Sequence, residues 1–211
     1  MLRSLPRNTW ASVVFACAVL YAQPVWAQFD EPDTIPKWAV GPYIEATFRG
    51  ALGELADGRT LDLSNGPAFG ARVEVRVGGA TALGLSGSYA RSSEKFETAP
   101  GDATTGGDLT LVNLVGEVLW RVKPSVPGYF VFGAGVRYSA PKEDDPLFGN
   151  ADSYTEPLGV IGLGIEPLRR RKGLLRLYLR LYIVATAEQP IASTSSLRTD
   201  IALGLAYLFR L

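Results

Sequence analysis

The chain has 211 residues, which is enough for one domain with a sizeable core. Its 21 basic and 21 acidic residues give a formal charge of zero, which argues against nucleic acid as a partner. The chain contains no histidine, and this excludes Ser–His and Cys–His catalytic pairs as well as His-ligated metal sites.

Residues 1–27 predict a signal peptide. Arg3 and Arg7 precede an apolar run over residues 10–21 that is too short to span a bilayer securely, and Ala27 ends a cleavage site. An uncleaved anchor is the alternative, and a lipoprotein signal ending at Cys17 is a weaker one. Cleavage would remove Cys17, the single cysteine, and would leave 19 basic and 21 acidic residues in a mature chain without a thiol or a disulfide.

The mature chain divides into two parts. Residues 28–37 carry two prolines and three acids and are expected to form a periplasmic leader, and residues 38–211 are expected to form the barrel described next. No stretch of 18 apolar residues follows residue 27, so no transmembrane helix is predicted.

From Trp38 onward apolar and polar residues alternate with a period of two, which predicts β-strands. Eight segments carry this pattern, at about residues 38–49, 67–77, 81–91, 109–122, 129–139, 158–166, 175–183 and 200–211. Short connections (78–80, 123–128 and 167–173) alternate with longer ones that are rich in acids and small polar residues (50–66, 92–108, 140–157 and 185–198). In outer-membrane barrels short turns face the periplasm and long loops face outside. The predicted fold class is therefore all-β, an eight-stranded antiparallel up-and-down transmembrane β-barrel.

Alternation alone does not say which strand face is buried, because a soluble barrel buries the apolar face and a membrane barrel turns it to lipid. All five lysines lie in the leader, turns or loops, whereas the strands carry Arg, Glu and Asp, which suit enclosed ion pairs. Gly and Ala are frequent on the polar face, as a narrow interior requires. Trp38 and Phe48 would lie about 25 Å apart along the membrane normal, the height of a lipid-facing apolar band. The apolar face is thus predicted to point outward, with an aromatic girdle of Trp38, Phe48, Phe69, Tyr89, Trp120, Phe130, Phe132, Tyr138, Tyr207 and Phe209.

The last residues form a pattern of their own. Leu205–Leu211 alternates apolar positions and places aromatics at Tyr207 and Phe209, and Leu211 stands where such C-terminal signals usually have Phe. Together with Asn65–Arg72 and Phe132–Tyr138, this pattern resembles the opacity-protein and OmpA-like family of eight-stranded outer-membrane barrels. Over residues 38–211 the resemblance implies a C-terminal assembly signal (Tyr207, Phe209, Leu211), with the barrel assembly machinery and outer-membrane lipid as partners. The peptidoglycan-binding domain of longer family members is not expected.

The polar strand face is predicted to line the interior. The predicted lumen cluster comprises Glu45, Arg49, Arg72, Glu74, Arg76, Asn113, Glu117, Arg121, Arg137, Glu166, Arg176, Arg180 and Asp200. With Arg210, eight arginines would face five acids. Isolated buried charges are costly and eight strands leave little space, so these groups are expected to pair into a plug. The alternative is a narrow polar path that favours anions. Two of the carboxylates could also perform acid–base chemistry, but an arginine on the same face as each favours ion pairs.

Two charged segments lie outside the strands. Residues 169–172 form a basic turn that is expected to be solvated, and binding of anionic headgroups or of a periplasmic partner is the alternative. Residues 140–157 contain Glu143, Asp144, Asp145 and Asp152, which could hold Ca²⁺ but lack EF-hand spacing, so a solvated acidic loop is expected.

These observations favour a non-enzymatic outer-membrane protein that contributes to envelope integrity or to surface interaction through its loops. The family resemblance supports this, because the enzymes among small outer-membrane barrels rely on histidine. No catalytic residue, cofactor or metal is assigned, and the sequence does not identify the extracellular partner. The alternative is a narrow porin-like barrel that passes a small solute, anionic or not, and a lower alternative is a soluble periplasmic barrel that binds an apolar ligand.

Overall fold

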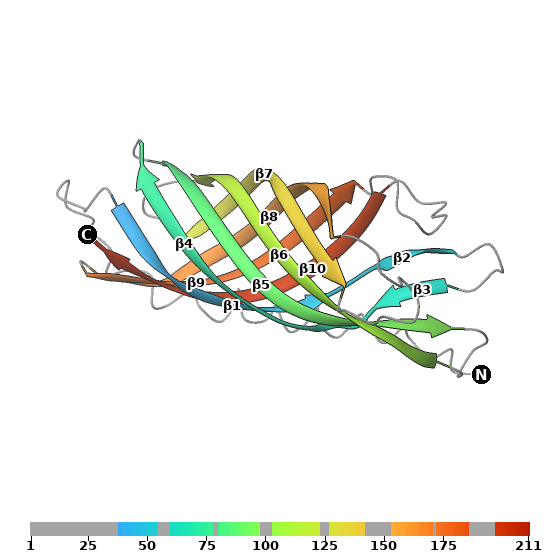
Figure 1. Cartoon of the computed structure of the whole chain (residues 1–211). Coiled ribbons are helices and arrows are strands. Elements are labelled where there is room, and N and C mark those ends of the chain that lie inside the picture. Colours follow the sequence, from blue (N-terminus) through green and yellow to red (C-terminus); the bar gives the residue numbers. More distant parts are fainter. Residues whose placement is uncertain are drawn as a thin grey trace, which may run out of the picture.

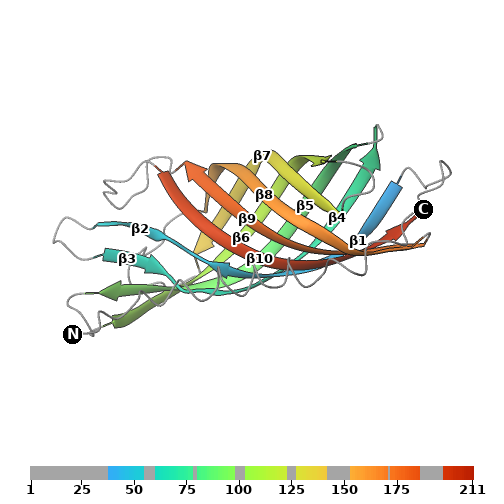
Figure 2. The same ribbon diagram turned by 180° about the vertical axis from the view of Figure 1, so that it is seen from behind.

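A computed structural model shows the chain as a barrel of strongly tilted β-strands (Figure 1, Figure 2). The structure describes residues 38–54, 60–77, 80–97, 103–122, 127–141, 153–170, 172–185 and 197–211. The predicted signal peptide and leader lie outside these ranges. Within them, no helix is long and apolar enough to cross a membrane.

The described residues form ten strand segments. They are β1 (Trp38–Phe48), β2 (Ala51–Glu54), β3 (Thr60–Leu63), β4 (Gly66–Arg76), β5 (Thr81–Glu97), β6 (Ala103–Arg121), β7 (Gly128–Pro141), β8 (Tyr154–Arg170), β9 (Gly173–Ala185) and β10 (Leu197–Arg210). Around the wall the order is β1, β4, β5, β6, β7, β8, β9 and β10, and β10 pairs with β1 to close the ring. All pairings are antiparallel, so the predicted eight-stranded barrel is confirmed.

A β-structure extends past the wall at the end opposite the C-terminus, on the right of Figure 1. β2 and β3 form a hairpin, β3 pairs with the distal part of β5, and β5 and β6 stay paired as far as Glu97 and Ala103. The stretches 50–66 and 92–108, predicted as long connections between strands, therefore contain paired strands. The apolar alternation stops where strands leave the lipid, although their pairing continues, so the sequence pattern loses them there. We call β2, β3 and the distal parts of β5 and β6 the surface extension.

The connection between β8 and β9 also differs from the prediction. Pairing shifts between Ile165 and Leu168, which marks a β-bulge that contains Pro167, a residue without a ladder N–H to donate. After the bulge β8 continues to Arg170, and Arg169 points inward and is buried. The predicted solvated turn over 169–172 was thus wrong for Arg169, whereas Lys172 is exposed.

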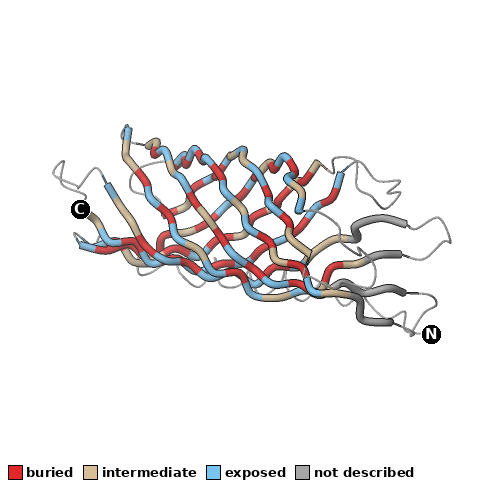
Figure 3. Tube along the Cα trace, in the orientation of Figure 1, coloured by how far each residue is buried: buried red, intermediate tan, exposed pale blue. Residues whose placement is uncertain are grey.

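Burial alternates along every strand of the wall (Figure 3). Outward side chains such as Phe48 and Phe69 are more than half exposed, at 54% and 56%, and they are apolar. Inward side chains such as Glu45 are buried and often charged. This arrangement is the inverse of a soluble barrel and suits a surrounding lipid phase, which argues against the soluble periplasmic alternative.

Candidate functional site

Many polar side chains of the strands lie in the interior of the barrel, into which every second residue of a strand points. On β9 the polar inward residues are Arg176, Tyr178, Arg180 and Tyr182, and all four are buried. The interior is therefore filled by long side chains from facing walls, and the geometry of their contacts decides what the barrel can do.

Near the short-turn end, where the chain terminates, the contacts centre on Glu166 of β8. Its carboxylate accepts hydrogen bonds from Nε and Nη2 of Arg121, both at 3.1 Å. It also accepts from Nε of Arg169 at 2.6 Å and from Nε of Arg176 at 2.9 Å. One buried carboxylate is thus shared by guanidinium groups from β6, β8 and β9.

From this centre the ion pairs continue across the lumen. Arg176 also binds Glu74 of β4, and Glu74 lies 3.5 Å from Nη1 of Arg72. Arg72 binds Glu117 of β6, whose Oε2 also lies 3.0 Å from Nη2 of Arg180. Because β4, β6 and β9 are not neighbours in the wall, these pairs bridge the interior from one side to another.

The chain of contacts ends at Glu45 of β1. Oε1 of Glu45 lies 3.5 Å from Nη1 of Arg180, and the Tyr182 hydroxyl lies 3.0 Å from both carboxylate oxygens. We call the connected set the lumen network; its members are Arg121, Arg169, Glu166, Arg176, Glu74, Arg72, Glu117, Arg180, Glu45 and Tyr182. Every member is buried.

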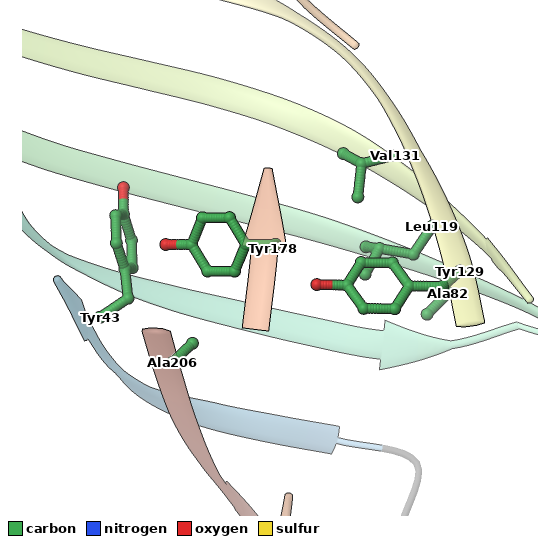
Figure 4. Packing of buried hydrophobic residues seen from close by; sticks show 7 residues of the cluster. All are labelled: Tyr43, Ala82, Leu119, Tyr129, Val131, Tyr178 and Ala206. Carbon is green, nitrogen blue, oxygen red and sulfur yellow. The ribbon is translucent and has the colours of Figure 1, made fainter. Parts of the chain in front are cut away.

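Tyrosine rings occupy the space between the ion pairs. Figure 4 shows Tyr43, Tyr178 and Tyr129 along the interior, together with Leu119 and Val131. The Arg180 guanidinium lies 4.6 Å from the centre of the Tyr178 ring, and the Arg72 guanidinium lies 5.8 Å from the same ring. The Nε atoms of both arginines lack a hydrogen-bond acceptor, and the ring face supplies part of the missing stabilisation.

Each of these rings lies against a glycine of the neighbouring strand. The directly paired positions are Tyr43 with Gly70, Tyr178 with Gly204, and Tyr129 with Gly164. A Cβ built at any of these glycines would overlap the tyrosine opposite. Glycine is needed here for close approach, because it lets the ring lie across the next strand.

A second group of charges lies toward the long-loop end. Arg137 donates to Oδ2 of Asp200 at 2.6 Å and to Oδ1 of Asn113 at 2.8 Å. Arg198 lies 3.6 Å from both Asp200 and Glu156. We call these five residues the outer cluster. Apolar side chains surround it: Val184 pairs with Arg198 on one side and with Leu158 on the other, in a buried group.

The top of β1 joins the outer cluster to the surface extension. Gly50 donates its backbone N–H to Oδ1 of Asp200 at 3.1 Å, and Arg49 donates to the carbonyl oxygen of Ser64. Burial lowers the pKa of the Arg49 guanidinium, and the charge of Asp200 opposes this shift. These contacts attach the segment between β1 and β4 to the mouth of the barrel.

Of the thirteen residues predicted for the lumen cluster, ten are buried and Arg49, Arg76 and Asn113 are half-buried. Arg210 has the inward parity of β10, is half-buried at the short-turn rim and donates to the carbonyl of Arg170.

Sequence reasoning missed three buried charges: Glu156, Arg169 and Arg198. Glu156 and Arg198 occupy inward positions just beyond the predicted strand ends, so extending the period-two count would have found them. Among the described residues seven buried arginines face six buried carboxylates, and the predicted lumen arginines Arg49, Arg76 and Arg210 are half-buried.

On the outer face, all ten residues of the predicted aromatic girdle are exposed. Trp120 packs near Phe130 with ring centres 6.4 Å apart, and Tyr207 meets Phe209 edge-on at 5.0 Å. Within the described ranges no three His, Cys, Asp or Glu side chains are grouped to hold a metal ion, and the acidic residues 143–145 and 152 lie outside those ranges.

Comparison with known proteins gives no matching family model and no matching curated protein. Solved structures do share the architecture. The crystal structure of Neisserial surface protein A matches with a TM-score of 0.55 at 11% identity, over 83% of this chain and 97% of that one. OprG from Pseudomonas aeruginosa matches with a TM-score of 0.48 at 9% identity, over 83% and 93% of the two chains. The first likeness shows the β-barrel fold, and at that level the predicted resemblance holds.

Proposed function

We propose that this outer-membrane β-barrel is a non-enzymatic envelope protein whose barrel is closed and anchors the surface extension, through which it contributes to envelope integrity or surface interaction. The lumen network is the observation that carries the proposal. The lining of a water-filled lumen would be accessible to water, whereas Glu166 and Arg176 have exposed fractions of 0%. A barrel closed in this way is inserted in the membrane but passes no solute.

The energetics of the network support a stable closure. Its charges are shared, so that Glu117 serves two arginines and Glu166 serves three. Removing one partner from a buried pair costs about 3–5 kcal/mol, because the other charge is left without compensation. Opening a path would require several such separations at once, which disfavours thermal opening.

Two further observations support the rest of the proposal. The absence of histidine removes the acid–base and nucleophile-activating group on which hydrolytic catalysis most often relies. The surface extension projects beyond the lipid-facing band at the long-loop end, the side on which a surface interaction would take place. The runner-up function, a narrow porin-like barrel, has no comparable support from the interior.

Planar-bilayer recording tests the proposal. Protein that shows heat-modifiable migration is expected to insert without steady conductance. In the Glu117→Ala/Arg180→Ala double variant both partners of a cross-lumen pair are gone, and measurable ion flow is expected. The Glu117→Gln/Arg180→Gln variant, which keeps most of the side-chain volume, is the control and should conduct less. Steady, anion-selective conductance of the unmodified protein would overturn the proposal and favour the transport barrel.

A further inference from the structure

The rim at the short-turn end carries three basic residues that lie outside the lumen network. Arg170 ends β8, Lys172 lies in the turn to β9, and Arg210 ends β10. Arg170 and Lys172 are exposed, and Arg210 is half-buried. We propose that these three residues, the basic rim, bind the anionic headgroups of phospholipids in the membrane leaflet at this end.

Hydrogen bonds to backbone carbonyl groups hold the three residues of the basic rim close together, beside a tryptophan. Arg210 donates its N–H to the carbonyl of Lys172 at 3.2 Å, and its side chain donates to the carbonyl of Arg170 at 3.2 Å. Leu211 donates its N–H to the carbonyl of Trp38 at 3.0 Å. Lys172 lies two strands away from Trp38, across β10. Because neighbouring strands are about 4.8 Å apart, the backbone of Trp38 is within roughly 10 Å of Lys172.

The outer face of the same strands fixes the height of the rim in the membrane. Trp38, Tyr207 and Phe209 are exposed there, and aromatic residues in membrane barrels occupy the boundary between hydrocarbon and headgroups. Arg210 is the next residue after Phe209, and Lys172 precedes Gly173, which pairs with Phe209. The cations therefore lie one residue beyond the aromatic boundary, at the level of the lipid phosphates.

The local charge also fits an anionic lipid. Among the described residues, the acidic side chains toward this end are Glu74 and Glu166, and both are buried within the lumen network. Asp108, an exposed acid, binds Ser93 on the opposite side of the lipid-facing band. A cation close to an anionic membrane surface contributes roughly fivefold in affinity, so two exposed cations suffice for a measurable lipid preference.

Tryptophan quenching by brominated lipids tests this proposal at the rim itself. With Trp10, Trp26 and Trp120 changed to Phe, Trp38 is the sole tryptophan of the full chain. The barrel is reconstituted in phosphatidylcholine vesicles that contain phosphatidylglycerol, with bromine on one lipid or the other. The local ratio of phosphatidylglycerol to phosphatidylcholine at Trp38 should exceed the bulk ratio by about two- to fivefold and should fall toward it in high salt.

The Arg170→Gln/Lys172→Gln variant should return the local ratio at Trp38 to the bulk value. Both side chains are exposed, so the variant should fold, and heat-modifiable migration checks that it does. Arg91→Gln is the matched control, because Arg91 is an exposed cation beside Tyr89 near the long-loop end, and it should leave Trp38 quenching unchanged. The proposal would be overturned if the phosphatidylglycerol-to-phosphatidylcholine ratio at Trp38 of the unmodified protein equalled the bulk ratio. That result is expected for a rim that is only solvated or that binds an acidic protein. Enrichment that persists without Arg170 and Lys172 would do the same.

Discussion

The two faces of the barrel wall are built from alternate residues of the same strands, yet they tolerate change differently. On β9, Leu177 faces lipid, whereas Arg176 and Arg180 on either side of it reach carboxylates on other strands. The outer face needs only apolar bulk, because contact with lipid has no preferred partner. The inner face needs particular partners at particular distances, so one change there disturbs several residues.

The largest effect is expected inside, at Glu166. In Glu166→Gln the carboxylate charge that Arg121, Arg169 and Arg176 share is lost, and uncompensated buried charge should destabilise the barrel by about 3–5 kcal/mol. Urea unfolding in vesicles, followed by the gel shift between folded and unfolded forms, measures this. Asp108→Asn, which removes an exposed acid, is the control and should change stability by less than about 0.5 kcal/mol. Equal stability of the two variants would remove the distinction between the faces.

A smaller effect is expected on the outer face, and it should depend on depth. Leu205 lies in mid-wall, where it pairs with Ile44 and Leu177. Leu205→Arg should cost about 2–4 kcal/mol, whereas Phe209→Arg at the rim should cost about 0–1 kcal/mol beyond the loss of the ring. The same unfolding assay compares them. Equal costs at both depths would show that this face does not lie in hydrocarbon.

The smallest of the three effects concerns the glycines under the tyrosine rings. Gly204→Ala should displace the Tyr178 ring and cost about 1–3 kcal/mol. Gly116→Ala is the control, because a Cβ there has its nearest neighbour at 3.8 Å, and it should be nearly neutral. If the Tyr178 ring is the obstacle, Gly204→Ala should lower the free energy of unfolding by less in a Tyr178→Ala background. If instead the effects of the two substitutions simply add in this double-mutant cycle, the ring does not lie against the glycine.

The same comparison explains what the sequence could and could not reveal. The outer face follows from period-two alternation, so the girdle and the eight wall strands were predictable from residues such as Trp38 and Phe48. The partners of the inner face were not, because Arg176 meets Glu74 only through strand tilt and register, which alternation does not encode. A single bulge at Pro167 shifted the parity of β8 and moved Arg169 from a predicted turn into the lumen network.

Beyond the lipid-facing band, alternation of apolar and polar residues no longer predicts where the strands lie. β2 and β3 have only four residues each, and the distal parts of β5 and β6 need no continuous apolar face, so they were predicted as loops. Glu156 and Arg198 were missed for a different reason: the predicted strands stopped two residues short of them, although both keep the inward parity of their strands. The membrane-facing part of the protein is thus the part that its sequence describes best.

Accessibility of a thiol inside the barrel tests the central claim, a lumen closed by paired charges, most directly. Ser86 points inward on β5 and donates to Oε1 of Glu117 at 2.6 Å. In a Cys17→Ser background, Ser86→Cys should resist a charged, water-soluble thiol reagent while the barrel is folded and react in urea. Ser93→Cys, at the long-loop end, should react in both states. Rapid modification of Ser86→Cys in the folded barrel would show a water-filled lumen and contradict the account.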